Sequence, residues 1–280
     1  MSNIEIVNEE GTKYLENVDN NSIDLILTDP PYIISKDSGM DKHHELVKDV
    51  DKNNKYTKTE EQWIKFKNKT KKKHIKEHGS EYTETEKENY LKYGTHLGKK
   101  YATKTDYGEW DRNFTTDDLN NFIKSYYNKL RKGGTLIIWF DIWKITELKE
   151  MMEKNKFKQI RFIEWIKTNP QPRNSKVNYL TNSREIALLG VKGGSPTFNS
   201  SYDNGIYKFP MASGKNRFHP TQKSLPLFEE LIKKHSNEGD TVMDTFLGGG
   251  TTATACKNTN RKFKGCEINK EYFDKVIELI

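Results

Sequence analysis

Helical and strand-forming segments alternate along residues 225–280, and this pattern limits the possible folds more than any other feature of the chain. Helices are predicted at 225–235, 251–258 and 271–280, and short apolar strands between them at 241–245 and 263–267. Strands that alternate with helices pair in parallel, because each helix carries the chain back across the sheet. The pattern therefore predicts an α/β fold with a doubly wound, mostly parallel sheet.

Five more strands are predicted in the remainder of the chain, which brings the expected sheet to seven. They lie at residues 4–7, 22–28, 135–140, 157–166 and 184–191. We expect helices at 115–131 and 143–155, the first capped by Thr115 or Thr116 and ended by Gly133-Gly134. Loops are expected at 169–182 and 193–216, where Pro, Asn, Ser and Gly accumulate.

The composition changes sharply between residues 36 and 106. Lys, Glu, Asn, His and Thr dominate this stretch and aliphatic residues are few. We interpret it as a basic insertion of helical pieces and loops, with Trp63, Ile64 and Phe66 as anchors for one helix. Residues 1–35 and 107–280 would then form the main domain.

The sequence Asp29-Pro30-Pro31-Tyr32 follows the strand at 22–28 directly. Two prolines end a strand, so these four residues are expected to form a loop at its C-terminal end. The Asp29 carboxylate and the Pro30 carbonyl can both accept hydrogen bonds from an amino group. Tyr32 offers a flat face on which a base can stack. The alternative interpretation is purely structural: a proline-rich strand end with a buried tyrosine.

A second loop is rich in glycine and lies between a strand and a helix, in the sequence Asp244-Thr-Phe246-Leu-Gly248-Gly-Gly250-Thr-Thr. Glycines there allow a sharp turn and close approach of the backbone to a ligand. The next strand ends at Glu267, where a carboxylate can accept hydrogen bonds from ribose hydroxyls. On its own, this arrangement fits a nucleotide-type ligand and an ordinary glycine turn equally well.

Together, these two motifs resemble those of the DNA amino-methyltransferases, which modify adenine N6 or cytosine N4. A third segment agrees, because residues 217–223 (RFHPTQK) resemble the HPTQKP segment of that family. The motif order is similar to that of the β group, a circular permutation of the Rossmann-like methyltransferase fold. Two departures are Ser224 in place of the usual proline, and FLGGG in place of the commoner FxGSG. The resemblance covers residues 1–35 and 107–280.

The resemblance implies S-adenosylmethionine as cofactor and a role for each motif. Asp29, Pro30, Pro31 and Tyr32 would hold the target amino group and stack on a base flipped out of duplex DNA. The cofactor would be bound by Asp244, Phe246, Gly248 and Gly250 of the glycine loop, by Glu267 at the end of the next strand, and by Thr221 and Lys223 of the third segment. Asp at the first motif position favours N6-adenine over N4-cytosine, where family members mostly have Ser.

A net charge of +7 and an isoelectric point near 9.0 suit a polyanionic partner such as double-stranded DNA. We expect target-recognition loops within residues 170–217, with Arg173, Lys176 and Arg217 as candidate contacts. The insertion offers Lys71, Lys72 and Lys73. A lysine run is by itself more often a solvated helix face, but in a DNA enzyme phosphate contact becomes the better interpretation.

Several features are expected to be absent. Cys256 and Cys266 form no CxxC pair, and no metal site is predicted. There is no Pro-Cys dipeptide of the kind that methylates a cytosine ring carbon. The lack of a signal sequence or a membrane-length apolar run favours a cytoplasmic protein. A cognate restriction endonuclease is a possible partner, and the protein is expected to be a monomer or a homodimer.

Three alternatives stay open at this stage. The enzyme could modify cytosine N4, or its substrate could be RNA or a protein side-chain amide, although protein-amide enzymes of similar fold usually carry Asn where this chain has Asp29. The chain could also be an inactive DNA-binding module, against which the intact Asp29, Tyr32, Gly248 and Glu267 argue.

Overall fold

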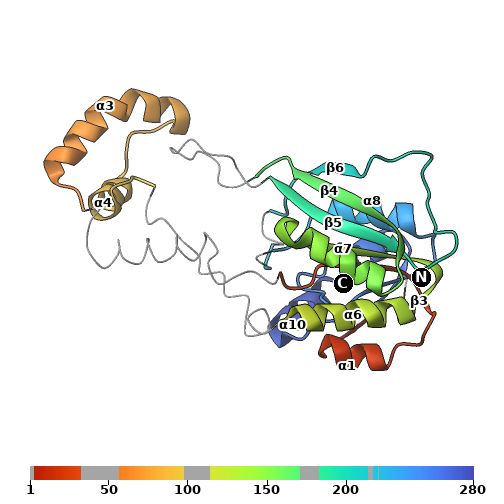
Figure 1. Ribbon diagram of the computed structural model, residues 1–280. Helices are drawn as coiled ribbons and strands as arrows, with labels where there is room; N and C mark the ends of the chain where they lie inside the picture. The colour runs from red at the N-terminus through yellow and green to blue at the C-terminus, as the bar shows by residue number, and fades with distance from the viewer. Residues whose placement is uncertain (1–2, 33–56, 98–113, 171–182, 214–216, 220) are drawn as a thin grey trace. The chain divides into compact units, whose positions relative to one another are not determined.

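The computed structural model describes residues 3–32, 57–97, 114–170, 183–213, 217–219 and 221–280. The chain divides into two compact units, one built from residues 1–33 and 107–280 and the other from residues 34–106. Each unit is drawn in Figure 1 and is described here by itself.

The larger unit is an α/β domain around one eight-stranded sheet in the order β1-β8-β7-β2-β3-β5-β4-β6. The strands are β1 Ile4–Val7, β2 Ile23–Thr28, β3 Leu130–Phe140, β4 Lys158–Lys167, β5 Arg184–Val191, β6 Ile206–Phe209, β7 Thr241–Asp244 and β8 Lys262–Cys266. Five neighbouring pairs are parallel, and only the two pairs that β5 makes with β3 and β4 are antiparallel. The expected doubly wound, mostly parallel sheet is confirmed.

Helices cover both faces of this sheet (Figure 1). They are α1 Gly11–Glu16, α6 Thr116–Lys129, α7 Ile145–Lys154, α8 Leu225–His235, α9 Thr251–Asn258 and α10 Lys270–Leu279, with the 3₁₀ turn η1 Ile142–Lys144 before α7. The side chains of α1, α6 and α7 pack into one hydrophobic core and those of α8, α9 and α10 into another. The period-2 alternation of the strands explains the two cores, because Ile26 enters the first and Leu25 and Leu27 the second.

The sequence prediction differs from the structure in three places in this unit. The sheet has an eighth strand, β6, within the segment expected to be loop, because Ile206–Phe209 pairs in parallel with β4. Helix α6 ends at Lys129, and β3 begins directly at Leu130 rather than after Gly134. The predicted helix at 143–155 begins with a 3₁₀ turn whose Trp143 is 90% exposed.

The smaller unit contains two helices, α3 Glu60–His78 and α4 Glu84–Tyr93. Each begins with a threonine capping box and ends at a glycine in the left-handed conformation, Gly79 and Gly94. Trp63 is buried and stacks with Phe66 on the inner face of α3. Ile64 is exposed, so its expected role as an anchor was wrong, since it lies on the opposite side of the helix from Trp63 and Phe66.

No helix in the described parts of the chain is long and apolar enough to cross a membrane.

Candidate active site

The strand order reverses between β2 and β7, which lie side by side in the sheet. From β2 the chain continues to β3 on one side, and from β7 it continues to β8 on the other. In open α/β sheets, ligands bind beyond the carboxyl ends of the strands at such a switch point. The Asp-Pro-Pro-Tyr turn follows β2 and the glycine loop follows β7, so both motifs lie at this position.

Asp244, the last residue of β7, links the two strand ends. Its carboxylate accepts hydrogen bonds from the hydroxyls of Thr28 (2.7 Å) and Thr252 (2.6 Å) and from the amide of Phe246 (3.0 Å). The side chain is buried, and burial raises the pKa of this carboxyl to about 6 although the three hydrogen bonds oppose the rise. Asp244 therefore fixes the start of α9 and the end of β2 relative to the glycine loop.

The glycine loop turns tightly into α9. Gly248 and Gly250 have φ values of +52° and +74°, in the left-handed region that glycine adopts without strain. A Cβ on Gly250 would lie 2.9 Å from Val276 of α10. The phenyl ring of Phe246 packs against Phe122 of α6 at 4.8 Å between ring centroids. The loop is thus held by its backbone geometry on one side and by an aromatic contact on the other.

Glu267 follows β8 and faces the glycine loop. Its carboxylate accepts hydrogen bonds from the amides of Gly248 (2.7 Å) and Asn269 (2.8 Å). Burial raises the pKa of Glu267, against the effect of these two bonds. Each carboxylate oxygen has a second acceptor position, so this carboxylate can bind further hydroxyl donors.

The two oxygens of the Asp29 carboxylate differ in their contacts. Its Oδ2 atom lies 2.8 Å from Nζ of Lys223, whereas Oδ1 is buried and has no hydrogen-bond partner. Burial raises the pKa of Asp29, and the ammonium of Lys223 opposes this rise. A buried acceptor without a donor costs free energy, about 1–3 kcal/mol or more for a charged group. Oδ1 is therefore a ready acceptor for a donor that is brought to this turn.

Lys223 belongs to a largely buried chain of alternating charges. Its Nζ atom also lies 2.6 Å from Glu185 at the start of β5, and Glu185 in turn pairs with Lys167 at the end of β4, again at 2.6 Å. Despite burial, the two lysines lower the pKa of Glu185 to about 2. Two anions and two cations balance, so the ionised form of Asp29 is compensated within the protein.

Tyr32 borders this group of charges and is partly exposed. Its hydroxyl accepts a hydrogen bond from Lys223 at 3.3 Å, and its ring meets the edge of Phe140 with centroids 6.0 Å apart. Pro30 is buried, while Pro31 and Tyr32 remain partly exposed. A partly exposed ring held by two contacts is a surface on which a planar group can stack.

The His-Pro-Thr-Gln-Lys segment joins the two loops. A Cβ on Gly248 would lie 3.4 Å from the ring of His219, and a Cβ on Gly249 would lie 3.0 Å from the side chain of Gln222. Burial, together with the charges of Lys223 and Arg217, lowers the pKa of His219 to about 4, so this ring is neutral at pH 7. From the same segment, Lys223 reaches Asp29. All three motifs therefore meet within one site.

Comparison with known proteins agrees with this geometry. The family model for N6/N4 methyltransferases, described as "DNA methylase", matches residues 23–278. The type II methyltransferase M.HpaI of Haemophilus parainfluenzae is 30% identical over 267 residues, which cover 94% of this chain and 69% of the relative. This chain is a DNA amino-methyltransferase of the N6/N4 family.

Other relatives and solved structures support the assignment and the fold. The type II methyltransferase M2.DpnII of Streptococcus pneumoniae is 28% identical over 190 residues, which cover 61% of this chain and 70% of the relative. The crystal structure of the M1.HpyAVI-SAM complex superposes with a TM-score of 0.59 at 24% identity, covering 99% of this chain and all of the other. The cytosine-N4-specific PvuII methyltransferase gives a TM-score of 0.63 at 15% identity, covering 99% and 86%.

S-adenosylmethionine is the methyl donor of this family, and the donor set at the switch point fits it chemically. The carboxylate of Glu267 suits the ribose hydroxyls, and the glycine turn permits close approach of the ligand to the backbone. Asp244 accepts three hydrogen bonds and is 3% exposed, and it holds the glycine loop against β2 at this position. Thr221 lies beside His219, with its hydroxyl 3.2 Å from Nδ1.

Several residues of the DNA methyltransferase site had no signal in the sequence. Glu185 and Lys167 lie on antiparallel strands far from every motif, and only the sheet register places them beside Lys223. Lys223 itself was expected to bind the cofactor, and the structure places its ammonium 2.8 Å from Asp29 of the Asp-Pro-Pro-Tyr turn. A lone acidic or basic residue on a strand is indistinguishable from a surface charge until its partners are known.

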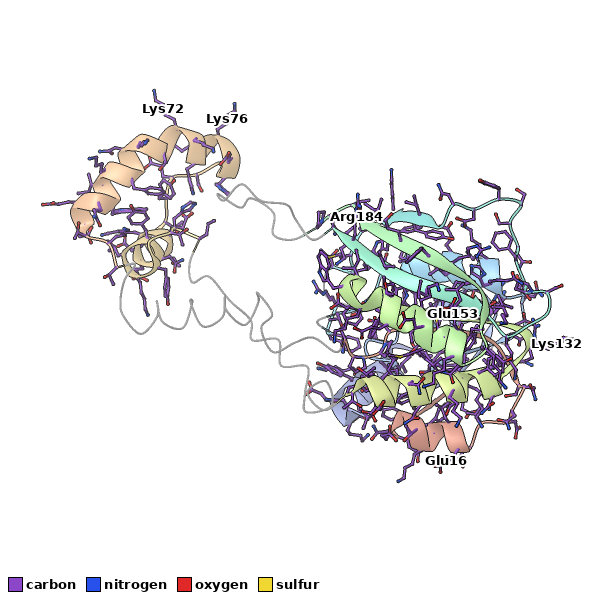
Figure 2. The ribbon with its side chains drawn as sticks, viewed as in Figure 1. Glu16, Lys72, Lys76, Lys132, Glu153 and Arg184 are labelled. Carbon is purple, nitrogen blue, oxygen red and sulfur yellow. The ribbon has the colours of Figure 1, made fainter. Side chains whose placement is uncertain are left out.

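The candidate DNA contacts are distributed over both units. Arg173 and Lys176 lie outside the described residues, and Arg217 lies beside His219 at the active site. Lys71 pairs with Glu81 and Lys73 with Glu77, whereas Lys72 makes no ion pair with the residues that the structure describes. Lys72 and Lys76 both point outward from α3 (Figure 2).

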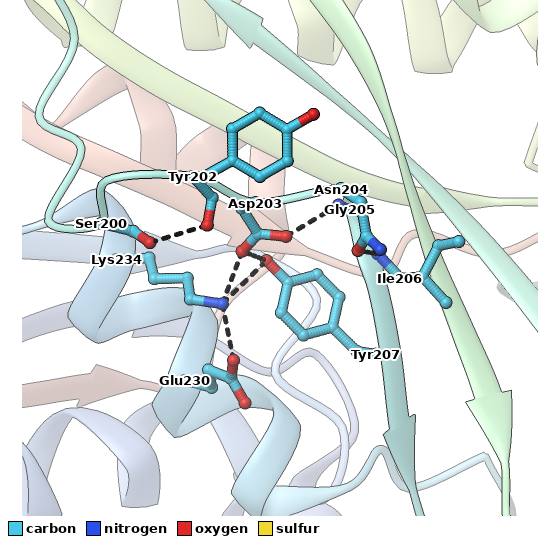
Figure 3. A network of polar contacts seen from close by, with 9 residues as sticks. All are labelled: Ser200, Tyr202, Asp203, Asn204, Gly205, Ile206, Tyr207, Glu230 and Lys234. Atoms are coloured by element: carbon cyan, nitrogen blue, oxygen red, sulfur yellow. Dashed lines mark hydrogen bonds and ion pairs between the residues drawn. The ribbon is translucent and has the colours of Figure 1, made fainter.

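The segment around β6, within the expected recognition loops, is tied to α8 by a polar network (Figure 3). Lys234 of α8 pairs with Asp203 (2.5 Å) and Glu230 (2.6 Å), and the Tyr207 hydroxyl donates to Asp203 at 2.6 Å. The Lys234 ammonium and the Tyr207 hydroxyl lower the pKa of Asp203 despite its burial. These contacts link β6 and the residues before it to α8.

Proposed function

We propose that this protein transfers the methyl group of S-adenosylmethionine to the N6 amino group of an adenine flipped out of duplex DNA. The observation that carries the proposal is the free Oδ1 atom of Asp29, a buried carboxylate oxygen without a partner at the carboxyl end of β2. An exocyclic amino group supplies the N–H donor that this oxygen lacks. The aspartate, where N4-cytosine enzymes mostly carry serine, supports adenine as the target.

Asp29 would act by orientation and charge. Its Oδ1 atom accepts one N–H of the amino group, so that the nitrogen lone pair is directed toward the glycine loop. Positive charge develops on this nitrogen as it takes up the methyl group, and a nearby ionised carboxylate stabilises that charge. The ammonium of Lys223 favours the ionised form of Asp29 and fixes its second oxygen. Bound S-adenosylmethionine would supply the methyl group by direct displacement, in which the N–C bond forms as the S–C bond breaks and S-adenosylhomocysteine leaves. The extra proton on nitrogen would pass through the Asp29 carboxylate to solvent, and no covalent enzyme intermediate is required.

Tyr32 would stack on the flipped base, since its ring is partly exposed and is held from behind by Phe140. Extrusion of a base costs a few kcal/mol, and stacking on an aromatic ring recovers about 1–3 kcal/mol of this cost. Glu267 and the glycine loop would bind the cofactor on the β7 side. Methyl donor and acceptor would thus approach each other across the Thr28–Asp244 hydrogen bond.

The type II names of M.HpaI and M2.DpnII support a sequence-specific enzyme that protects DNA from a cognate restriction endonuclease. For this chain, that role is part of the proposal, as is the contribution of the insertion and of residues 170–217 to DNA binding. Either a monomer or a homodimer is compatible with the site, because every residue assigned to the reaction lies in the larger unit.

The test is to identify the modified base. The purified protein is incubated with radiolabelled S-adenosylmethionine and, in separate reactions, with unmethylated duplex DNA, RNA or a protein extract. The labelled DNA is then digested and its nucleosides are separated. Label is expected in N6-methyldeoxyadenosine. Label in N4-methyldeoxycytidine would favour the cytosine alternative, label only in RNA or protein would refute DNA as the substrate, and no label would favour the inactive module.

A further inference from the structure

The smaller unit has little apolar core to hold it together. Among the residues of this unit that the structure describes, only Trp63 and His74 are fully buried. Four aromatic rings form the contact between α3 and α4 and the connection between them: Trp63, Phe66, Tyr82 and Tyr90. Modules of this size commonly need a disulfide or a metal ion in addition to their core. Both cysteines of the chain lie in the larger unit.

His74 is a buried polar residue of this core, on α3. Its Nδ1 atom lies 3.0 Å from the backbone carbonyl oxygen of Ser80, and its Nε2 atom lies 2.9 Å from Oε1 of Glu86 on α4. His96, which follows α4, completes the group, and the three side chains offer one ligand atom each, all within 4.8 Å of one another. Three segments that are separate in the sequence thus meet at one point.

The hydrogen-bond roles at His74 point to a cation between the two side chains. A carbonyl oxygen can only accept, so Nδ1 carries the hydrogen. In the neutral ring, Nε2 then presents a lone pair to a carboxylate oxygen, which also has only lone pairs to offer. Either a proton or a metal ion must lie between them. An N–H from a ligating histidine to a backbone carbonyl is the outer contact that orients metal-bound imidazoles.

We propose that His74, Glu86 and His96 form a binding site for a divalent transition-metal ion, best matched by Zn²⁺, that joins α3, α4 and the segment after α4. Two imidazole nitrogens and one carboxylate oxygen are an established zinc ligand set, with bonds of about 2.0–2.2 Å. Two such ligands on a tetrahedral ion lie about 3.3 Å apart, so the 2.9 Å between Nε2 and Oε1 needs to widen only slightly. Water would take the fourth position.

No metal site is predicted from the sequence, because the cysteines form no CxxC pair and no Cys/His cluster. The ligands are spaced by twelve and ten residues, a pattern that only the turn between the helices brings together. The site lies outside the active-site residues and does not depend on the proposed adenine specificity. Its expected role is to hold the insertion in one conformation.

The test uses the full-length protein, freed of metal by a chelator. Zn²⁺ is titrated in competition with a chromophoric chelator, and Co²⁺ is added separately as a spectroscopic probe. We expect one equivalent of Zn²⁺ per chain with a Kd below about 1 µM, and visible Co²⁺ absorption bands typical of four-coordinate N/O ligation. Failure to bind one equivalent, or Co²⁺ bands of the hexaaqua ion only, would overturn the proposal in favour of a proton shared by His74 and Glu86.

Two variants locate the site. Glu86→Gln keeps the oxygen that caps α4 through the Thr83 amide but removes the negative charge, and His96→Ala removes a ligand outside both helices. Each is expected to weaken Zn²⁺ binding by at least about tenfold. The controls are Glu81→Gln and His78→Ala, which change the same residue types in the same unit. The His78 ring contacts that of His74, with centroids 4.6 Å apart, but His78 is not one of the three ligands, so both controls should leave the affinity within about twofold.

The variants are also compared by hydrogen exchange with and without Zn²⁺. Added Zn²⁺ should slow exchange in α3 and α4 of the wild-type protein and of both controls, but not in the two ligand variants. Unchanged affinity in both ligand variants, or equal loss in the controls, would contradict the ligand set. Because exchange reports on α3 and α4 directly, a variant that fails to fold is recognised by its fast exchange in the absence of metal.

Discussion

The ammonium of Lys223 lies 2.8 Å from Oδ2 of Asp29, which leaves Oδ1 of that carboxylate as a buried acceptor. One motif of the chain thereby fixes the orientation of another. The same lysine contacts Glu185, whose partner Lys167 completes a balanced set of two cations and two anions. The reactive turn is therefore aligned by charges from three other parts of the sheet domain.

Replacing Lys223 should affect the reaction more than cofactor binding. In Lys223→Met, Asp29 loses a charge-assisted hydrogen bond worth about 1.5–3 kcal/mol, so we expect kcat to fall by about 10- to 150-fold. The unfolding free energy should also fall, by about 3–5 kcal/mol, because two buried carboxylates lose their shared cation. Single-turnover methylation and chemical denaturation measure the two effects.

The matched control for this change is Lys233→Met, an exposed lysine of α8. It should leave both the rate and the stability close to wild type. If Lys223→Met behaved like this control, Lys223 would have no part in positioning Asp29.

Gly250→Ala should destabilise the glycine loop for two separate reasons. The alanine must adopt a φ of +74°, which costs about 1–2 kcal/mol, and its Cβ would lie 2.9 Å from Val276, which adds about 1–3 kcal/mol. Gly239→Ala has a similar φ of +82° but meets nothing within 4 Å, so it isolates the backbone cost. The unfolding free energy should therefore fall further in Gly250→Ala than in Gly239→Ala, and equal falls would show that the close packing against α10 has no role. Cofactor binding, measured by calorimetry, should weaken in Gly250→Ala alone.

The raised pKa of Asp244 makes stability depend on pH in a specific direction. Between its ordinary pKa of 3.8 and its folded value of about 6, the folded state keeps a proton that the unfolded state releases. Rising pH therefore favours unfolding over this range, by up to about 3 kcal/mol at full ionisation. The unfolding free energy of wild type minus that of Asp244→Asn should fall from pH 4 to pH 6 and level off above. A difference that is constant or rises would refute the assignment.

The outward lysines of α3 test the proposed role of the insertion in DNA binding. Replacing Lys72 and Lys76 with alanine should weaken binding to all sequences alike and reduce the slope of log K against log[salt] by about 2, one for each lost phosphate contact. Removing the same charge from α7, in Lys149→Ala with Lys154→Ala, is the control. Equal slopes in the two double variants would place the insertion away from the DNA backbone.

The sequence predicted the sheet well because each strand and helix of the β7–α10 region is a short segment with a clear period. Helices α8 and α9 begin and end at the predicted residues. Strand β6 was missed, because four residues between Gly205 and Pro210 read as a loop and only the neighbouring edge of β4 makes them a strand.

The motifs were predictable as separate loops, but their connections were not. Asp29, Gly248 and Glu267 each follow a strand, and parallel strands bring such positions to one edge of the sheet. The pairing of Lys223 with Asp29 and Glu185 depends on side-chain reach across that edge. The same limit applies to His74, Glu86 and His96, whose spacing carries no recognisable motif.

The central claim is that Asp29 receives the target amino group beside the cofactor, and Asp29→Ala tests it most directly. Single-turnover methylation of duplex DNA is measured with a saturating concentration of S-adenosylmethionine, and cofactor affinity is measured separately by calorimetry. Loss of a preorganised acceptor should slow methyl transfer by about 10²–10³-fold or more, while the Kd for S-adenosylmethionine stays within about threefold. Methyl transfer at a rate near that of the wild-type protein would contradict the account.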